Sequence, residues 1–305
     1  MRRGETRRGV VLFITLAILT MLGTVVFLFL QRTGELKKSV RQNHAIIQTN
    51  LILGDISRFL KSRNFNQDDI YYGAGVPVSL DLGPVGGMLT IDSAQSRLNI
   101  NAVLKAVAKH QEALNAFLVW MERQKVKHPY LLLALMLDTI DPDLYERGRH
   151  TEIRLQEPWF QNGSIRDTMA MRKIFHYYKV HSGDNGPSLQ AWEEVFGYEG
   201  ATLDLNYATI DQLTLLYPDL PIETLDRLAA HDTRWQRPDE LPIDDPYRSV
   251  VLQPHMGITP VLATQTVAVS IDFNTTGECR GHMGFWMGLK KKKITHLSLS
   301  AVLCQ

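Results

Sequence analysis

Residues 10–30 read VVLFITLAILTMLGTVVFLFL and contain no charged side chain. At about 1.5 Å per residue, a helix of this length spans roughly 30 Å, the thickness of the hydrocarbon core of a bilayer. A cleaved secretory signal has a shorter apolar core of about 7 to 15 residues and ends at small residues, whereas residues 30–33 read LQRT. A buried helix of a soluble core is the weaker alternative, because the run is apolar on every side. We therefore expect a transmembrane helix over residues 10–30.

The charges on either side of this run predict its orientation. Four arginines and a single acid, Glu5, precede it within residues 1–9, whereas Arg32, Lys37 and Lys38 follow it and Glu35 offsets one of these charges. The positive-inside rule places residues 1–9 in the cytoplasm and the chain beyond residue 31 on the opposite side. This predicts a single-pass protein of the cell inner membrane with a cytoplasmic N-terminus and a periplasmic globular domain.

The junction between the basic leader and the apolar run is a candidate processing site. Arg7 and Arg8 are followed by Gly9, which directly precedes Val10. A short basic leader that ends in glycine resembles the site of prepilin peptidase, which cuts on the cytoplasmic side and leaves the apolar helix in place. We expect cleavage between Gly9 and Val10.

The apolar run continues into an amphipathic segment over residues 31–62. Apolar residues recur there at roughly helical spacing among Lys, Arg, Gln and Asn. They are Leu36, Val40, Ile47, Leu51, Phe59 and Leu60. The pattern predicts one continuous helix to about residue 61, on the order of 75 Å long. A helix that lies half in lipid and half against a globular head is the design of a pilin.

The periodicity of the remaining chain changes twice. Short alternating segments in residues 63–96, and again in 246–305, predict strands, with Gly86-Gly87 as a turn. Residues 97–245 have helical periodicity instead, as in Val103 to Gln124. With 45% hydrophobic residues, the chain has ample material for a packed core. We expect an α+β fold, with a pilin-like long N-terminal helix plus an antiparallel sheet and an inserted mostly helical domain.

A short motif occurs twice in the helical segment. Residues 96–102 read SRLNINA and residues 203–209 read LDLNYAT, each ahead of further helices. We expect Asn101 and Asn206 to cap the helix that follows. The second stretch has the outline of a helix-hairpin-helix, but its turn at residues 218–221 lacks the glycines that let backbone amides approach a phosphate. With a formal net charge of only +1, no nucleic-acid partner is expected.

Four sequence elements occur together in a characteristic order. They are the leader ending at Gly9 before the apolar helix, RLNINA at residues 97–102, LDTIDPD at 137–143 and LDLNYAT at 203–209. In this order they resemble the K-type minor pseudopilins of type II secretion systems. The resemblance extends over nearly the whole chain.

This resemblance implies a function in assembly. A K-type protein would lie at the tip of the type II secretion pseudopilus, initiate its assembly and support export of folded proteins across the outer membrane. Its partners would be I- and J-type minor pseudopilins, prepilin peptidase and inner-membrane lipid. The resemblance also implies a structural Ca²⁺ ion in the helical domain, with ligands that the sequence does not assign. The alternative is a minor pilin of a type IV pilus-like system, acting in pilus assembly or adhesion.

The candidate chemistry in the sequence is sparse. Asp138, Asp141 and Asp143 form the densest acidic cluster of the helical segment, without the spacing of an EF-hand. The simpler interpretation is that they cap and solvate a helix end before Pro142. Ten histidines are scattered, and no nucleophile elbow, P-loop or dinucleotide fingerprint occurs. We therefore predict no catalytic and no cofactor-binding residues, against the third hypothesis of a membrane-anchored hydrolase.

Two cysteines, Cys279 and Cys304, flank the last two predicted strands. In an oxidising periplasm a disulfide between them would link the C-terminal hairpin and contribute about 3 kcal/mol. The sequence leaves open whether their Cα atoms come within bonding range.

Ile14 bears on the position of the subunit in a filament. After the expected cleavage it becomes the fifth residue, where pilins that stack inside a filament usually carry Glu. A carboxylate in the bilayer core needs a partner, taken to be the N-terminal amine of an earlier subunit. A subunit without this acid needs no earlier amine, and a large head fits only at the distal end. We expect a tip position, with a plain membrane anchor as the alternative interpretation.

Overall fold

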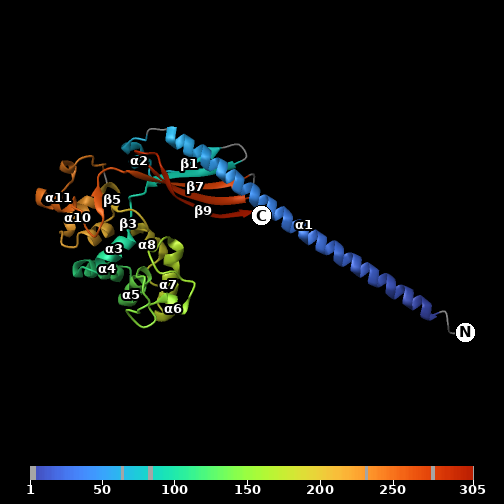
Figure 1. Cartoon of the computed structure of the whole chain (residues 1–305). Helices are drawn as coiled ribbons and strands as arrows, with labels where there is room; N and C mark the ends of the chain where they lie inside the picture. The colour runs from blue at the N-terminus through green and yellow to red at the C-terminus, as the bar shows by residue number, and fades with distance from the viewer. Residues whose placement is uncertain (1–4, 63–64, 82–84, 231–232, 276–278, 305) are drawn as a thin grey trace.

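The N-terminal part of the fold is one uninterrupted helix. In the computed structural model, residues 5–62, 65–81, 85–230, 233–275 and 279–304 are described, with side chains from Leu19 onward except at some positions in 38–52, at 85, in 275–279 and from 299. Helix α1 (Glu5–Ser62) has 58 residues, or roughly 87 Å at 1.5 Å per residue. Figure 1 shows it projecting far beyond the rest of the protein. The predicted continuous helix is confirmed.

A five-stranded antiparallel sheet lies against the C-terminal part of α1. Its strands are β1 (Val78–Asp81), β2 (Val85–Ser93), β7 (Thr266–Thr275), β8 (Cys279–Gly288) and β9 (Ile294–Cys304), in the spatial order β1-β2-β7-β8-β9. Strands β2 and β7 pair in the register Leu89↔Ile271, although the whole helical segment separates them in sequence. The expected α+β fold, with a long helix and an antiparallel sheet, is confirmed.

One face of the sheet forms a hydrophobic core with α1. Residues alternate along a strand, so every second side chain of β7 faces this core. The buried members are Ile56 and Leu60 of α1, Ile70 of α2 (Gln67–Gly73), Leu89, Val267, Val269, Ile271, Phe273, Met283, Phe285 and Met287. The helix is therefore fixed to the sheet by its last turns, and its earlier turns extend past it.

The turn predicted at Gly86-Gly87 is wrong, because both glycines lie inside β2. A Cβ atom on Gly87 would lie 2.6 Å from the carbonyl oxygen of Asp272 in the neighbouring strand β7. Glycine is needed there for close backbone approach, a role that gives the same sequence signal as a turn.

The helical segment forms a second, larger body beside the sheet (Figure 1). Its first elements are β3 (Leu98–Asn99), α3 (Ile100–Val107), α4 (Gln111–Arg123), α5 (Pro129–Ile140), α6 (Ile153–Gln156), α7 (Thr168–Ser182), α8 (Leu189–Val195) and β4 (Phe196–Gly197). The remaining elements are β5 (Thr202–Asp204), η1 (Leu205–Tyr207), α9 (Ile210–Leu216), α10 (Ile222–Ala229), η2 (Pro238–Glu240), α11 (Asp245–Val251) and β6 (Thr259–Val261). The helix expected over Val103 to Gln124 is two helices, because the amides of Lys109 and His110 both bond to the carbonyl of Ala106 and close α3.

Aromatic side chains fill the centre of this second body. Trp192 packs on Phe196 with ring centroids 4.5 Å apart, and Phe196 contacts Trp120 at 5.0 Å. Phe117 is fully buried beside them. The buried apolar residues of the protein thus form two separate clusters, one in the helical body and one under the sheet.

Helix α11 and strand β6 pack with the helical body. Val251 and Ile258 are buried in its cluster, and β6 pairs with β5. The junction predicted between residues 245 and 246 falls at the start of α11. We therefore place the return of the chain to the sheet at Thr266, the first residue of β7.

Two short parallel strand pairs divide the helical body into two halves. In the first half, β3 pairs with β4 in the register Leu98↔Phe196, after the chain has passed through α3 to α8. In the second half, β5 pairs with β6 in the register Leu203↔Pro260, after α9 to α11. Each half therefore starts on a strand, runs through helices and closes on a parallel partner.

The asparagines Asn101 and Asn206 occupy equivalent places in the two halves. The Asn101 side chain accepts from the amide of Ile165 at 2.8 Å and donates to the carbonyl of the same residue at 2.9 Å. The Asn206 side chain makes the same pair of bonds with Trp235, at 2.7 and 3.2 Å. Each asparagine thus fixes a distant loop through both backbone groups of one residue.

The expectation that these two asparagines cap helices is wrong. The caps are Asn99, which accepts from the amide of Asn101 at the start of α3, and Thr209, which forms a capping box with Gln212 at the start of α9. A cap must stand just before the first helical turn, whereas Asn101 already lies inside α3.

Candidate functional site

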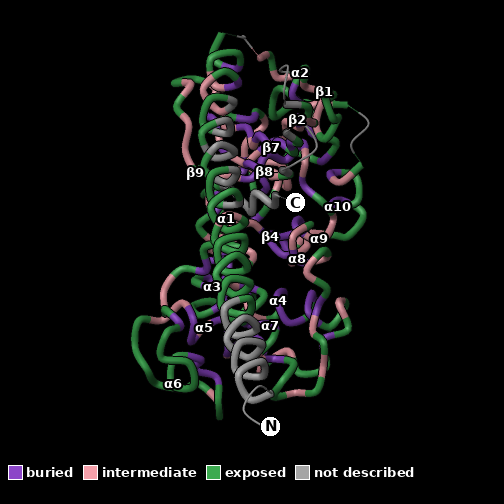
Figure 2. The backbone as a smooth tube through the Cα atoms, turned by 90° about the vertical axis from the view of Figure 1, so that its right-hand side faces the viewer, coloured by how far each residue is buried: buried purple, intermediate pink, exposed green. Residues whose placement is uncertain are grey.

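Helix α1 has two apolar faces, and only one of them packs on the sheet. At about 100° per residue, Leu53, Ile56 and Leu60 lie on the side that faces the sheet core. On the opposite side lies a second set of apolar residues with exposed side chains. These are Leu36 (65%), Val40 (64%), Ile47 (58%) and Leu51 (65%). We call this set the outer stripe, and Figure 2 shows the exposed side of α1 along much of its length.

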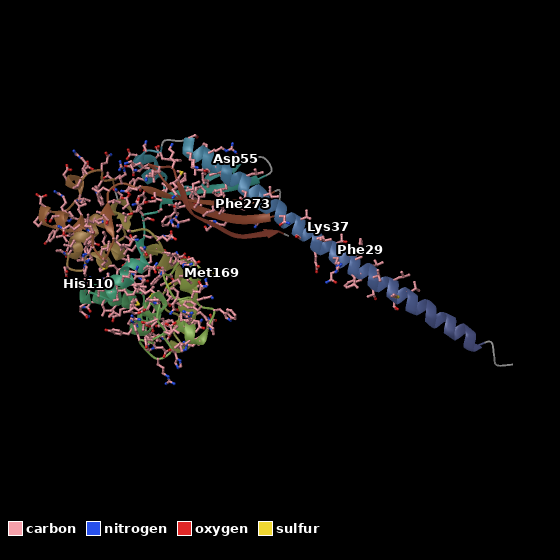
Figure 3. All side chains as sticks on the ribbon, viewed as in Figure 1. Phe29, Lys37, Asp55, His110, Met169 and Phe273 are labelled. Carbon is pink, nitrogen blue, oxygen red and sulfur yellow. The ribbon has the colours of Figure 1, made fainter. Side chains whose placement is uncertain are left out.

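The outer stripe continues the exposed apolar surface of the projecting part of α1. Figure 3 shows Phe29 and Lys37 on that part, whereas Asp55 lies where the helix passes over the sheet that carries Phe273. Among the side chains that are described, no helical stretch has the length and apolarity of a membrane span. Residues 10–18 of the expected span, including Val10 and Ile14, lie outside those side chains, as does Gly9.

The acidic cluster of LDTIDPD is an ion-pair network. Asp138 is fully buried and accepts from the guanidinium of Arg147 at 2.6 Å, from the Arg147 amide at 3.0 Å and from the hydroxyl of Thr151 at 2.5 Å. Arg147 also reaches Asp141 at 2.8 Å, and this hydrogen bond holds the pKa of the Asp141 carboxyl below its usual value. These carboxylates hold the loop after α5, rather than only capping and solvating a helix end.

The network does not fit a calcium site. Ca²⁺ takes six to eight oxygen ligands, but the oxygens of Asp138 and Asp141 face the cation Arg147. Throughout the described part of the chain, no three His, Cys, Asp or Glu side chains come together in a way that would hold a metal ion.

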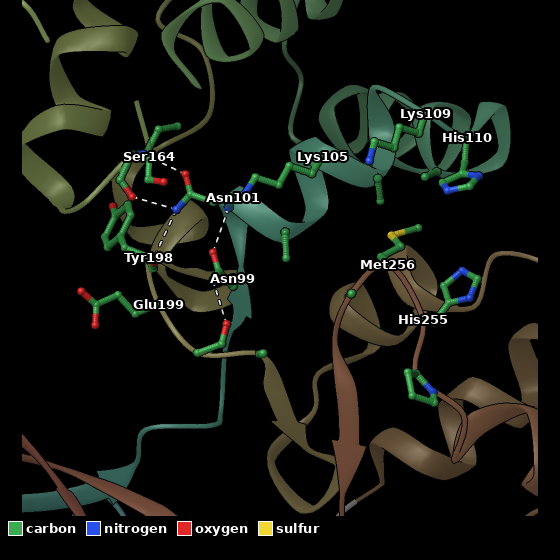
Figure 4. Close-up of a pocket in the computed structure, with 18 of the residues that line it drawn as sticks. Asn99, Asn101, Lys105, Lys109, His110, Ser164, Tyr198, Glu199, His255 and Met256 are labelled. Atoms are coloured by element: carbon green, nitrogen blue, oxygen red, sulfur yellow. Dashed lines mark hydrogen bonds between the residues drawn. The ribbon is translucent and has the colours of Figure 1, made fainter. Parts of the chain in front are cut away.

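A cleft of about 1030 Å³ separates the two halves of the helical body. One wall consists of α3 and the start of α4, with Lys105, Lys109 and His110, and Figure 4 shows His255 and Met256 across from His110. The loop after β4 closes one end, where the carboxylate of Glu199 contacts the imidazole of His296 from β9. Both halves and the sheet therefore contribute to one concave surface.

Hydrogen bonds from the repeated motif hold the floor of this cleft. The amide group of Asn101 donates to the carbonyl of Tyr198 at 3.1 Å, and that of Asn99 donates to the carbonyl of Gly200 at 2.7 Å. The same Asn101 binds Ile165, which also lines the cleft. Motif residues recognised in the sequence for their repetition thus position this site.

The charges in the cleft are mostly positive and unpaired. Lys105, Lys109 and Arg166 line it, and within the described residues no ion pair joins any of them to an acid. Glu112 is the one lining acid besides the paired Glu199. These cations belong to none of the motifs recognised in the sequence, because Lys105 ends α3 and Lys109 lies in the turn after it.

A serine, a histidine and an aspartate meet on the outer face of the sheet. The His282 ring lies 3.5 Å from the hydroxyl of Ser270 and 2.8 Å from the carboxylate of Asp272. The Asp272 side chain is 73% exposed and that of His282 is 44% exposed, and the neighbouring strand amides are engaged in the β7–β8 ladder. Such an open arrangement, on a paired strand surface, lacks the enclosed site and free amide donors of a hydrolase.

The backbone register of the last two strands brings the two cysteine positions together. Cys279 in β8 is the direct partner of Cys304 in β9. Directly opposed residues of antiparallel strands have Cα atoms roughly 4.5 to 5.5 Å apart, within the range of a disulfide. Their side chains lie outside those that the structure describes.

A long N-terminal helix on an antiparallel sheet, with a helical insert between the strands, is a pilin-like fold. A solved structure is similar to this fold over nearly the whole chain. It is a chain of the crystal structure of the GspK-GspI-GspJ complex from the type 2 secretion system of enterotoxigenic Escherichia coli, with a TM-score of 0.54 and 14% sequence identity, covering 90% of this chain and 99% of the other. No family model and no curated protein sequence matches the chain. The fold expected from the resemblance to K-type pseudopilins is confirmed.

Proposed function

We propose that this chain is a minor pseudopilin of a type II secretion system. Residues 10–30 anchor it in the inner membrane, prepilin peptidase removes residues 1–9, and the sheet and helical body lie in the periplasm. The likeness in fold to a chain of the GspK-GspI-GspJ complex supports this proposal. A structural role in assembly, and not catalysis, is the function that such a scaffold serves.

The observation that carries the proposal is the outer stripe of α1. Four large apolar side chains, each more than half exposed, face away from the sheet that the same helix covers. Exposed apolar surface of this kind marks an interaction site, and a row at helical spacing is suited to pack against another helix. We propose that I- and J-type minor pseudopilins pack their own long helices on this row.

We further propose that the subunit occupies the tip of the pseudopilus and initiates its assembly. Ile14 cannot pair with the amine of an earlier subunit, and the helical body adds bulk beside the sheet. Both features fit a subunit with nothing stacked above it. A minor pilin of a type IV pilus-like system remains the second candidate, since the long helix serves both systems equally.

Co-purification tests the outer stripe. The full-length chain is expressed with tagged I- and J-type pseudopilins and extracted in detergent. It is compared as wild type and as two single variants, Val40→Arg and Ile47→Arg. The control is Ser39→Arg, which adds the same charge about a quarter turn away on α1. We expect each stripe variant to reduce the amount of recovered partner at least about fivefold relative to wild type, because burying an unpaired charge at the interface is costly. Equal recovery with Val40→Arg and with Ser39→Arg would contradict the assigned interface.

Two further measurements test processing and position. Mass analysis of the mature protein should give an N-terminus at Val10, and a chain that begins at Met1 or beyond residue 30 rejects the cleavage site. Cysteines introduced between residues 14 and 40 should crosslink to the other minor pseudopilins. Abundant ladders of self-crosslinked subunits are incompatible with a single copy at the tip.

We also propose that Cys279 and Cys304 form a disulfide, on the basis of their backbone register. The closed loop would contribute about 3 kcal/mol. Reduction, or a Cys304→Ser substitution, should lower the melting temperature of the full chain to the same extent. Alkylation of both thiols in the untreated protein would refute the bond.

A further inference from the structure

We infer that the cleft between the two halves of the helical body binds an extended acidic segment of another polypeptide. The cleft lies apart from the outer stripe of α1, so this second interaction surface stands independently of the proposed assembly contacts. The volume of the cleft, about 1030 Å³, is near the upper end of the range of about 300 to 1,000 Å³ that is typical of ligand-binding pockets.

The charge of the occupant follows from the cations along the α3 wall. Lys105 lies in the last turn of α3, Lys109 lies in the turn that follows this helix, and Arg166 belongs to the loop that Asn101 holds in place. None of the three is neutralised by an acid among the described residues, and their exposed side chains are free to contact a ligand. A partner that carries carboxylates would complement this wall, and complementary charge both selects the partner and speeds its association.

The shape and lining of the cleft favour a peptide over a small anion. Apolar side chains also line the cleft: Ala102 and Met256 are partly exposed, and Ala106 and Ile165 are buried behind them. A small anion would use only the charged positions and leave this surface exposed. In an extended strand, successive side chains point in opposite directions, so a chain that alternates acidic and apolar residues presents carboxylates to one wall and apolar groups to the other.

The backbone at the cleft also offers hydrogen-bond donors. Helix α4 begins there, with His110 at its N-cap, and this side chain makes no capping bond. The first amides of a helix have no partner within it, so they supplement the lysines as donors for a carboxylate. The cations and the apolar lining define the site, and these amides add to it.

The test uses the full-length chain in detergent and fluorescence anisotropy. The probe is a fluorescein-labelled octapeptide of alternating Glu and Val, compared with the same peptide carrying Gln in place of Glu. We expect saturable binding of the Glu peptide, at least about tenfold weaker binding of the Gln peptide, and weakening of the Glu peptide when salt is raised.

Charge-reversal variants locate the binding. Lys105→Glu combined with Lys109→Glu should weaken the Glu peptide at least about twentyfold. The matched control is Lys179→Glu, an exposed lysine in the last turn of α7 as Lys105 is in the last turn of α3, and it should change affinity less than about twofold. Ser164→Trp, which narrows the cleft without changing its charge, should also weaken binding. Each variant is compared with wild type by its thermal unfolding.

Three results overturn the inference. The first is unchanged affinity in a folded Lys105→Glu, Lys109→Glu variant. The second is equal loss of affinity in Lys179→Glu, which would indicate a general charge effect. The third is equal binding of the Glu and Gln peptides, which would show that the cleft does not recognise carboxylates.

Discussion

The two halves of the helical body use the same motif with one chemical difference. Leu98-Asn99-Ile100-Asn101 and Leu203-Asp204-Leu205-Asn206 share a short parallel strand, a turn in which the second residue accepts from the amide of the fourth, and a buried asparagine that holds a loop. The difference is the second residue. Asn99 donates to the carbonyl of Gly200, whereas Asp204 accepts from the hydroxyl of Thr264 at 2.8 Å.

That difference shows what each half is attached to. Thr264 also contacts Ser93 at the end of β2, at 3.2 Å, so the acid of the second motif connects the helical body to the sheet. The first motif connects only parts of its own half. The amide of Asn99 donates to a carbonyl, which can only accept, whereas the carboxylate of Asp204 accepts from a hydroxyl, which can donate.

Removing both halves together should have the largest effect and tests whether the body is separable. Replacement of residues 95–265 by Asn-Gly should leave β2 and β7 as a tight hairpin, because Ala94 already bonds to Thr266. This variant should still unfold cooperatively in a thermal scan. A variant that lacks residues 97–245 should aggregate instead, since Val251 and Ile258 then lose their buried neighbours. Loss of the transition in both variants would show one continuous core.

Removal of either buried asparagine tests whether the halves are equivalent. Asn101→Ala and Asn206→Ala each leave both backbone groups of one loop residue unsatisfied, and we expect a loss of about 3 kcal/mol in denaturant unfolding. Asn206→Ala should cost more, because Asn206 also donates to the carbonyl of Leu262 and to Asp204. The exposed Asn115→Ala should cost less than about 0.5 kcal/mol. An equally small loss at Asn206 would mean that its loop is held by packing alone.

Arg147 belongs to the first half, and no described residue of the second half makes a matching ion pair with a fully buried acid. Arg147→Ala should cost about 2 kcal/mol, since it leaves the fully buried carboxylate of Asp138 without its cation while the guanidinium itself is partly exposed. Trypsin should then cleave within residues 141–152 faster than in wild type, with the second half unaffected. An unchanged cleavage rate would indicate that Thr151 alone holds the loop.

The smallest effect concerns the second residue of the motif, where one half has a neutral amide and the other a carboxylate. Burial raises the pKa of the Asp204 carboxyl, so the folded protein binds this proton more tightly than the unfolded chain. The ionised group therefore costs stability as pH rises from about 4 through its folded pKa, and the full cost is present above it. Asp204→Asn copies the first motif and removes this titration. Its melting temperature relative to wild type should increase between pH 4 and pH 7, and a constant difference would show that Asp204 does not contribute.

Local patterns in the sequence predicted the elements that local physics determines. The uncharged run at residues 10–30 and the spacing of Leu36 to Leu60 indicated one long helix, and alternation indicated the strands that form the sheet. The repeat of the two motifs was also visible. In these cases the signal and the structure both depend on neighbours within a few residues.

The failures share a different cause. Gly87 is glycine because of Asp272, Asn101 is buried because of Ile165, and Asp138 is paired because of Arg147. Each partner lies elsewhere in the chain, so the same residue types fit a turn, a helix cap or a solvated acid equally well. The cleft is the extreme case, because residues from α3, the loop after β4 and the loop before β6 meet there only in the folded protein.

The pairing of β2 with β7 has a consequence for the order of events during synthesis. At about 5 to 20 residues per second, roughly ten seconds or more pass between the emergence of Ser93 and that of Thr266. Over that interval β2 has only β1 beside it, and the sheet-facing side of α1 has no β7 or β8 to cover it. The helical body lies between β2 and β7 in the sequence, so it can fold before β7 emerges. Until then the β1–β2 hairpin lacks its neighbouring strand β7. A nascent chain of this design would spend its most aggregation-prone period with the sheet half built, which makes that interval the point at which a chaperone would be most useful.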